Sequence, residues 1–254
     1  MKNDIFMFAH QDDEIAIFKS IKNSIELKNN VLVFYLTNGD NSITKNLDLV
    51  FKRQNESKKV LIQLGVKKEN IFFLGNNYNI KSYNLFRYLD VVYKKLANII
   101  NNLKDISLIY THAWEGGNID HDACYILALK LLRNNPKIID GYQFSFYNSY
   151  KIPFFFYRVF CPIKQNGTII NLKITNREKI KFIKYLFYYP SQIKIWIGLY
   201  PFVVFKIIFN QYNYLQKIDI KHSLSKPHKG LLWYEKQKFI KFKKLVIFFN
   251  HFLR

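Results

Sequence analysis

The sequence has few cysteines and few glycines, so it lacks the usual signs of a disulfide-stabilised or multidomain protein. Its 254 residues include two cysteines, Cys124 and Cys161. Their spacing fits neither a disulfide framework nor a cysteine-based zinc site, so we expect a reducing compartment. No linker rich in glycine or serine and no internal repeat is visible, and the sequence therefore marks no firm domain boundary.

Long apolar runs are also missing. The first run, Ile5 to Ala9, is too short for a signal peptide and leads directly into polar residues. The stretch from Ile195 to Phe209 is shorter than the ~20 apolar residues that span a bilayer, and it contains Pro201 and Lys206. A core helix or an interfacial helix is therefore favoured over a transmembrane span. We expect a cytoplasmic protein, with peripheral contact at the inner membrane face as an alternative.

Acidic residues are scarce in one half of the chain. Residues 1–126 contain 16 Lys and Arg against 14 Asp and Glu, whereas residues 127–254 contain 23 against 4. This asymmetry indicates an anionic partner, and anionic lipid headgroups, anionic glycans and nucleic acid all fit it. No RNA- or DNA-binding signature accompanies the basic residues, so nucleic acid is disfavoured.

The first half contains a regular alternation of apolar patterns. Nearly half of all residues (49%) are hydrophobic, which is enough for a sizeable core. The expected strands are 5–8, 31–36, 71–74 and 106–110, and the expected helices are 17–25, 50–64, 85–103 and 120–132. Strands that alternate with helices predict an α/β fold with a Rossmann-like, mostly parallel sheet and helices on both faces.

The second half has a different character. We expect residues 1–135 to form the Rossmann-like catalytic core. Residues 136–254 are expected to form a basic, aromatic-rich C-terminal extension that completes the sheet and supplies a substrate- or membrane-facing surface. The alternation from Tyr142 to Tyr147 predicts a half-exposed strand, Asn166-Gly167 predicts a hairpin turn, and Asn176 to Tyr189 predicts a helix that ends at Pro190.

The first polar cluster, His10-Gln11-Asp12-Asp13-Glu14, follows the first strand. His10 and Asp13 are three residues apart where a helix begins, so both can reach one metal ion. Asp12 is then free to take a proton from a metal-bound water. Helix capping is the competing interpretation, because acidic residues favour helix N-termini. Three successive carboxylates repel one another more than a cap requires, and this favours a metal site.

The second cluster extends from Thr111 to Asp122 and follows the fourth strand. Gly116-Gly117 permits a sharp turn, and His121 alone would be interpreted as a solvated residue at a helix start. Both clusters, however, lie at the carboxyl ends of parallel strands, where His10 and Asp13 need a third ligand. His121 is the natural candidate. Two histidines and one carboxylate leave positions open, as catalytic sites do, and the set suits Zn²⁺ and also Fe²⁺.

At these residues the sequence resembles the LmbE-like and PIG-L-like zinc-dependent N-acetylglucosaminyl de-N-acetylases. The family motif A-H-P-D-D-E is matched by residues 9–14, and G-G-H-x-D-H by residues 116–121. Arg53 and Glu56 match R-x-x-E, and residues 64–66 match L-G-V. Tyr189-Pro190-Ser191-Gln192 is similar to the family's Y-x-S-Q element. The likeness is firm over about residues 4–130.

The resemblance implies a zinc-dependent hydrolase that removes the acetyl group from an N-acetylated amino sugar and releases acetate. The amino sugar would be of the N-acetylglucosamine type, free or linked to lipid or glycan. The implied roles are zinc binding by His10, Asp13 and His121, general base catalysis by Asp12, orientation of an imidazole by Asp120, substrate contact by Arg53, and lining of the pocket by Gln192.

The sequence departs from the family pattern at two positions. Gln11 replaces a proline, which a first helical turn tolerates. Asn118 replaces a histidine that, in the family, is thought to stabilise the oxyanion or to help protonate the leaving amine. Asn118 can donate a hydrogen bond to an oxyanion but cannot act as an acid. A catalytically impaired sugar-binding or regulatory protein of the same fold is therefore the alternative. His112 is a candidate replacement and Cys124 could reach a metal, although core packing is the simpler role for each.

Overall fold

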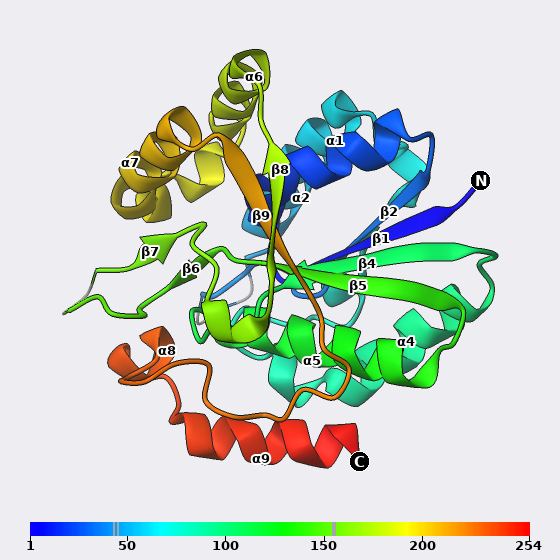
Figure 1. The fold of residues 1–254 in the computed structure, drawn as a ribbon, viewed down its shortest axis with the longest axis vertical. Helices are drawn as coiled ribbons and strands as arrows, with labels where there is room; N and C mark the ends of the chain where they lie inside the picture. The colour runs from blue at the N-terminus through cyan, green and yellow to red at the C-terminus, as the bar shows by residue number, and fades with distance from the viewer. Residues whose placement is uncertain (43, 45, 154–155) are drawn as a thin grey trace.

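The computed structural model describes residues 1–42, 44, 46–153 and 156–254, and within them a seven-stranded sheet lies between two layers of helices (Figure 1). The strand order is β3-β2-β1-β4-β5-β9-β8. The strands are β1 (Asn3–Phe8), β2 (Asn30–Tyr35), β3 (Ile71–Phe73), β4 (Ile106–His112), β5 (Ile138–Phe144), β8 (Ile169–Lys173) and β9 (Tyr212–Lys217). The first five pair in parallel, and β9 is antiparallel to both of its neighbours. A separate two-stranded ribbon consists of β6 (Tyr147–Asn148) and β7 (Arg158–Val159).

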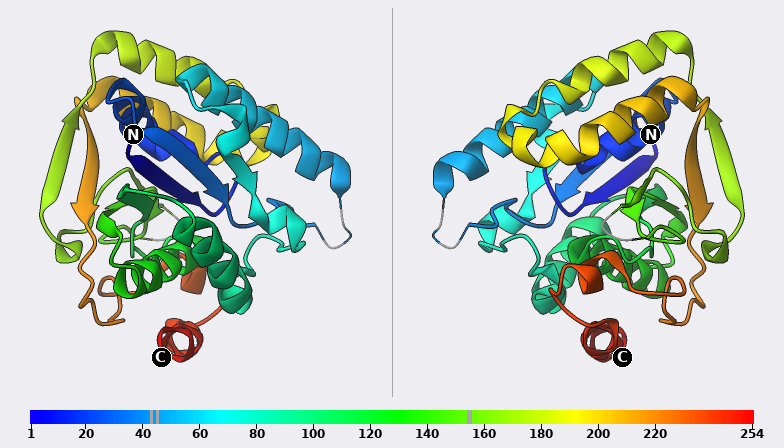
Figure 2. Two further views of the ribbon diagram at one scale, coloured as in Figure 1. Left: turned by 90° about the vertical axis from the view of Figure 1, so that its right-hand side faces the viewer. Right: turned by 90° about the vertical axis from the view of Figure 1, so that its left-hand side faces the viewer.

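Helices cover both faces of the sheet, as Figure 2 shows from two sides. One layer contains α1 (Phe18–Glu26), α2 (Leu47–Leu64), α6 (Asn176–Leu186) and α7 (Ile193–Phe209). The other contains α4 (Leu89–Asn101), α5 (Ile119–Asn134) and α9 (Phe242–Leu253). The short elements are α3 (Leu74–Asn77), α8 (Trp233–Lys236) and the 3₁₀-helices η1 (Asp13–Ile17), η2 (Lys68–Asn70), η3 (Leu85–Arg87), η4 (Lys164–Asn166) and η5 (Pro190–Gln192).

The central strand β1 links the two cores. Ile5 and Met7 pack into the core under α4 and α5, whereas Phe6 and Phe8 pack into the core under α1 and α2. This division follows from the two-residue period of a strand. Since β1 pairs in parallel with both β2 and β4, the loops that leave the carboxyl ends of β1 and β4 lie side by side. Those two loops carry the two polar clusters.

The predicted fold class is confirmed: the sheet is mostly parallel and has helices on both faces. The four strands expected in the first half are present, although Leu74 begins α3 instead of ending β3. Helix α2 ends as expected, because Gly65 adopts a left-handed conformation with φ 106° and its N–H donates to the carbonyls of Leu61 and Ile62. The helix expected from residue 85 is interrupted at Tyr88, between η3 and α4.

The hairpin expected at Asn166-Gly167 is wrong. The residues before Gly167 form η4, and the strand after it, β8, pairs with β9 far along the chain. The physical reason is a tertiary contact. The side chain of Gln216 in β9 donates to the carbonyls of Ile163 and Gly167 at 2.9 and 2.7 Å, which fixes this turn to β9. The strand expected to continue to Tyr147 also ends earlier, at Phe144.

The apolar stretch at 195–209, for which we expected a core or interfacial helix, forms most of α7, with Pro201 inside the helix. The side chains of residues 194–196, and so that of Ile195, lie outside the described part of the structure. Leu199, Val203 and Ile207 are buried against the core. Among the helices of the described residues, none combines the length and the hydrophobicity needed to cross a bilayer.

Candidate active site

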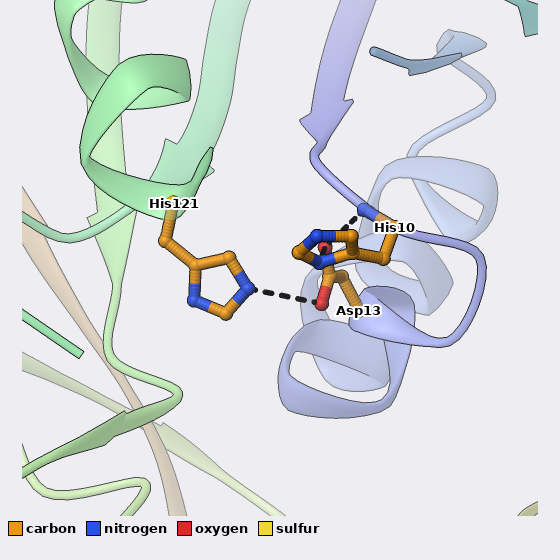
Figure 3. Close-up of side chains that lie close together, drawn as sticks. All are labelled: His10, Asp13 and His121. Carbon is orange, nitrogen blue, oxygen red and sulfur yellow. Dashed lines mark hydrogen bonds and ion pairs between the residues drawn. The ribbon is translucent and has the colours of Figure 1, made fainter. Parts of the chain in front are cut away.

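Residues from both polar clusters meet at the carboxyl edge of the sheet. His10 follows β1, Asp13 begins η1, and His121 lies in the first turn of α5. One potential ligand atom from each residue lies within 4.8 Å of the others, and all three residues are buried. Figure 3 shows the two imidazoles approaching the carboxylate of Asp13 from different segments of the chain.

The potential ligand atoms lie close enough together to share one metal ion. Nε2 of His121 is 3.3 Å from Oδ1 of Asp13, and Nδ1 of His10 is 3.5 Å from Oδ2 of Asp13. With metal–ligand bonds of ~2.0–2.2 Å, tetrahedral geometry separates neighbouring ligand atoms by about 3.3–3.6 Å, and both distances to the Asp13 carboxylate are of this size. The three residues therefore form a candidate site for Zn²⁺, and the same donor set also suits Fe²⁺.

The protonation states of two of these residues also fit metal binding. Burial acts to raise the pKa of Asp13, but the imidazoles of His112, His121 and His10 lower it well below its usual value. Burial and the neighbouring His112 lower the pKa of His121 to about 3. An ionised carboxylate and a neutral imidazole are the forms that coordinate a metal ion.

Asp120 forms a buried hydrogen bond with the imidazole of His10. Its Oδ2 lies 3.0 Å from Nε2 of His10, and its carboxylate accepts from the backbone N–H groups of Tyr83 and Leu85. When Nε2 donates to Asp120, the lone pair of Nδ1 faces Asp13. Burial alone would lower the pKa of His10, but Asp13 and Asp120 raise it to about 10. The carboxylates around this imidazole therefore favour a bound proton, which a metal ion held by His10 would displace.

Replacing Asp120 by Asn is expected to weaken metal affinity by about 10–100-fold, because the groups that orient a metal ligand have effects of this size. The amide cannot accept from His10 and both backbone N–H groups at once. The measurement is competition against a chromogenic chelator. Asp122→Asn is the matched control, since burial raises the pKa of Asp122 to about 8 and an amide resembles its neutral form. An equal loss in both variants would indicate general disruption of α5 and would contradict the orienting role.

Asp12 lies beside the candidate metal ligands without belonging to them. It lines the same cavity as His10 and Asp13, and its Oδ1 is 3.2 Å from a guanidinium nitrogen of Arg53. Burial raises the pKa of Asp12 to about 7, although Arg53 acts in the opposite direction. A carboxylate that titrates near neutrality is suited to accept and return a proton. Its backbone φ of 149° is rare for a residue with a side chain, and strain of this kind is common at functional sites.

Arg53 is committed to contacts within the chain. It donates to the carbonyls of Gly39 and Gln11 at 2.6 and 3.2 Å, in addition to its pair with Asp12. The amide oxygen of Gln192, in the orientation that satisfies its neighbours, accepts from Nε of Arg53 at 2.9 Å. Both residues line the cavity. These contacts indicate that Arg53 helps to hold the side chain of Asp12 in position.

The Tyr189–Gln192 segment is fastened to the first half of the chain. The Tyr189 hydroxyl donates to Glu14 at 2.8 Å, and the Ser191 N–H donates to Glu56 at 3.0 Å. Burial raises the pKa of Glu14 to about 7. Glu14, Glu56 and Ser191 thus hold Gln192 against Arg53. The sequence motifs contain all of these residues, but only the fold reveals that they form one unit.

Asn118 is the N-cap of α5. Its Oδ1 accepts from the N–H of Asp120 at 2.8 Å, and its Nδ2 lies 3.3 Å from the hydroxyl of Tyr147. Asn118 and Tyr147 both line the cavity. Oδ1 of Asn118 is used by this helix cap. Its side-chain N–H groups can still donate a hydrogen bond, which is the function considered for Asn118 from the sequence.

Tyr147 is a site residue that the sequence motifs did not reveal. Burial raises the pKa of its hydroxyl well above the usual value, so it remains a neutral donor. Its position depends on Glu115, a buried carboxylate that accepts from the N–H groups of Phe146 and Tyr147 at 2.7 and 3.1 Å. A Cβ on Gly117 would lie 2.0 Å from the carbonyl oxygen of Tyr147, so this approach requires glycine. In the sequence, this close approach of Tyr147 could have been indicated by the Gly116-Gly117 pair.

His112 lies beside the candidate metal ligands, and Cys124 lies in the core. The Nε2 of His112 lies 3.0 Å from Asp13, and its ring stacks on His121 with centroids 3.8 Å apart. His112 therefore contacts two of the candidate metal ligands, Asp13 and His121. Cys124 is fully buried in the core under α5, and it is outside the candidate metal group found among the described residues.

Two neighbouring cavities lie beside these residues. The cavity at the candidate metal site, here called the catalytic cavity after the candidate role of its residues, has a volume of about 80 Å³ and is lined by residues that include His10, Asp12, Asp13 and Asn118. A neighbouring pocket of about 270 Å³ includes Tyr157, Trp233 and Phe239 in its lining. The two share Tyr83, Asn118, Tyr147 and Leu199. A small group can thus reach the candidate metal site while a larger body occupies the aromatic pocket.

Comparisons with known proteins agree with this geometry. The family model described as GlcNAc-PI de-N-acetylase, PIG-L, matches residues 5–132. No curated protein sequence matches the chain significantly.

Solved structures with a similar fold include deacetylases. The zinc-inhibited form of teicoplanin deacetylase Orf2 has a TM-score of 0.63 and 14% identity, over 86% of this chain and 98% of that one. The A40926 pseudoaglycone deacetylase Dbv21 has a TM-score of 0.60 and 14% identity, over 85% and 96%. The N,N'-diacetylchitobiose deacetylase from Pyrococcus horikoshii has a TM-score of 0.57 and 17% identity, over 86% and 84%.

Proposed function

Because the chain belongs to the GlcNAc-PI de-N-acetylase (PIG-L) family, we propose that it is a Zn²⁺-dependent hydrolase that removes the acetyl group from an N-acetylated amino sugar and releases acetate. The observation that carries this proposal is the meeting of His10, Asp13 and His121 beside Asp12, in a cavity of about 80 Å³. Two imidazoles and one carboxylate leave room for substrate and water, as catalytic metal sites do.

A Zn²⁺ ion held by His10, Asp13 and His121 would polarise the acetamide carbonyl and make the attacking water more acidic. Asp12 accepts a proton from that water and returns it to the nitrogen of the leaving amine. The side-chain amide of Asn118 and the hydroxyl of Tyr147 donate hydrogen bonds to the carbonyl oxygen as negative charge develops on it. This arrangement supplies donors where the family has a histidine, and it assigns both proton transfers to Asp12.

The proposed substrate is an amino sugar of the N-acetylglucosamine type, free or linked to a lipid or glycan. The names of similar structures include deacetylases of teicoplanin and of diacetylchitobiose. The aromatic pocket of about 270 Å³ beside the cavity suits the sugar ring or the group attached to it. The sugar's acetamido group would then point toward Asp12 and the metal ligands.

Acetate release from a panel of N-acetylated sugars tests this proposal. The protein is purified without chelators, its metal content is measured, and N-acetylglucosamine, its glycosides and diacetylchitobiose are assayed with Zn²⁺ or, under anaerobic conditions, Fe²⁺. We expect metal-dependent acetate release from at least one of them. Bound metal without acetate release from any sugar would contradict the proposed reaction.

The second candidate function is that of a catalytically impaired sugar-binding or regulatory protein. It is favoured by one observation: Asn118 stands at the position of the family histidine and its oxygen serves as a helix cap. Calorimetric binding of an acetamido sugar without turnover would support it. Acetate release would exclude it.

A further inference from the structure

Helices α6 and α7 and the turn between them present a surface of exposed apolar side chains, which we name the α6–α7 face. Six of its large apolar residues are between 59% and 74% exposed: Ile180, Phe187, Ile193, Ile197, Phe205 and Phe209. Single exposed apolar residues are ordinary on soluble proteins, but a contiguous group of them marks an interaction surface. Figure 1 shows α7 at the margin of the molecule, with α6 beside it.

Helix α7 carries more apolar surface than its contact with the core requires. Its buried residues Leu199, Val203 and Ile207 are spaced by four and form one narrow stripe. A helix that packs only against a core has polar residues on its other side. Here the exposed positions Ile197, Phe205 and Phe209 are apolar instead. The pattern therefore indicates a second apolar environment on the outer side of α7.

An apolar groove crosses the same face. It has a volume of about 430 Å³ and is lined by residues that include Leu186, Phe187, Pro190, Ile193, Ile197 and Pro201. No charged side chain is among its lining residues in the described part of the chain. A groove of this size and chemistry fits a hydrocarbon chain.

The charges around the face are positive. Arg177, Lys181 and Lys184 project from α6 as exposed residues. Glu178 is the one acidic residue in the sequence of α6 and α7, and its carboxylate is held by Lys19 and Lys22 of α1 at 2.8 and 2.6 Å. Two copies of the face would bring like charges together. A partner with a negatively charged surface and an apolar interior would match both the positive charges and the exposed apolar side chains.

We propose that the α6–α7 face binds an anionic phospholipid bilayer, with the exposed side of α7 in the interfacial layer and the groove around an acyl chain. Gln192 directly precedes α7, and Leu199 lines the catalytic cavity from its inner side. Docking would therefore hold the cavity at the membrane surface. The inference concerns a binding surface, and it does not depend on the reaction proposed above.

Sedimentation of the full chain with lipid vesicles tests the proposal. The wild type is expected to sediment with vesicles of phosphatidylcholine and phosphatidylglycerol, less with phosphatidylcholine alone, and less at high salt. The Phe205→Ser/Phe209→Ser variant should partition about 100-fold more weakly, since each lost phenyl ring removes apolar burial worth about tenfold. Lys181→Glu/Lys184→Glu should weaken binding to the anionic vesicles selectively. Ile220→Ser/Ile247→Ser, which changes exposed apolar residues elsewhere, should bind as the wild type does.

Two results would overturn the proposal. One is a wild type that does not sediment with anionic vesicles, or a Phe205→Ser/Phe209→Ser variant that binds them as well as the wild type does. The other is a lipid-free wild-type dimer that this variant abolishes, which would make the face an interface between copies of the chain. Acetate release from a soluble amino sugar is measured on the same proteins and should be unchanged, so failure of the proposed reaction is recognised separately.

Discussion

Replacing Asp12 by Asn is expected to lower the rate of acetate release by about 10²–10⁴-fold while the metal stays bound. Asp12 is in hydrogen-bonding contact with Arg53 and lines the cavity, but it is outside the candidate metal group of His10, Asp13 and His121. An amide keeps the shape of the side chain and cannot accept the proton of the attacking water. Turnover should therefore fall without loss of metal, as measured by acetate release and metal content on the same sample.

The pH profile separates the loss of a base from a change of shape. Burial raises the pKa of Asp12 to about 7, and a bound cation will lower it. A base must be ionised to act, so wild-type activity should rise with pH and level off at or below about pH 7. The residual activity of Asp12→Asn should lack this rise. Normal turnover in the variant, or an unchanged acidic limb, would exclude Asp12 as the base.

The parts of this protein that could be predicted from sequence depend on local patterns. The runs 5–8 and 31–36 were predicted to be strands because continuous apolar residues suit a strand buried on both faces, and they correspond to β1 and to β2, which ends at Tyr35. The site prediction joined His10 to His121 because both follow strands whose carboxyl ends meet in a parallel sheet. Those rules need no knowledge of distant contacts.

The parts that could not be predicted depend on such contacts. Tyr147 reaches the cavity because the buried carboxylate of Glu115 binds the backbone around it. The Asn166-Gly167 turn has the local signal of a hairpin, yet Gln216, about fifty residues later, determines its course. Arg53 lines the cavity, as a residue expected to contact substrate would, but its hydrogen bonds to Gly39, Gln11 and Asp12 depend on tertiary contacts. In each case a tertiary hydrogen bond decides between alternatives that the local sequence leaves equal.

Replacing His121 by Ala is expected to abolish metal binding and, with it, acetate release. His121 is the candidate ligand from the second cluster, and its Nε2 lies 3.3 Å from Asp13. Without it, one imidazole and one carboxylate remain, too few for a tight site. Metal content measured by atomic emission should fall from about one ion per chain to near zero.

Thermal unfolding distinguishes this loss from general damage to α5. An ion present at ~1,000 times its dissociation constant stabilises the folded chain by about 4.1 kcal/mol, so a chelator should lower the Tm of the wild type. His121→Ala should show no such shift, because it has no ion to lose. His228→Ala is the matched control, since His228 is also buried but belongs neither to the cavity nor to the candidate metal group. Full metal binding by His121→Ala would mean that the two clusters do not share one metal ion.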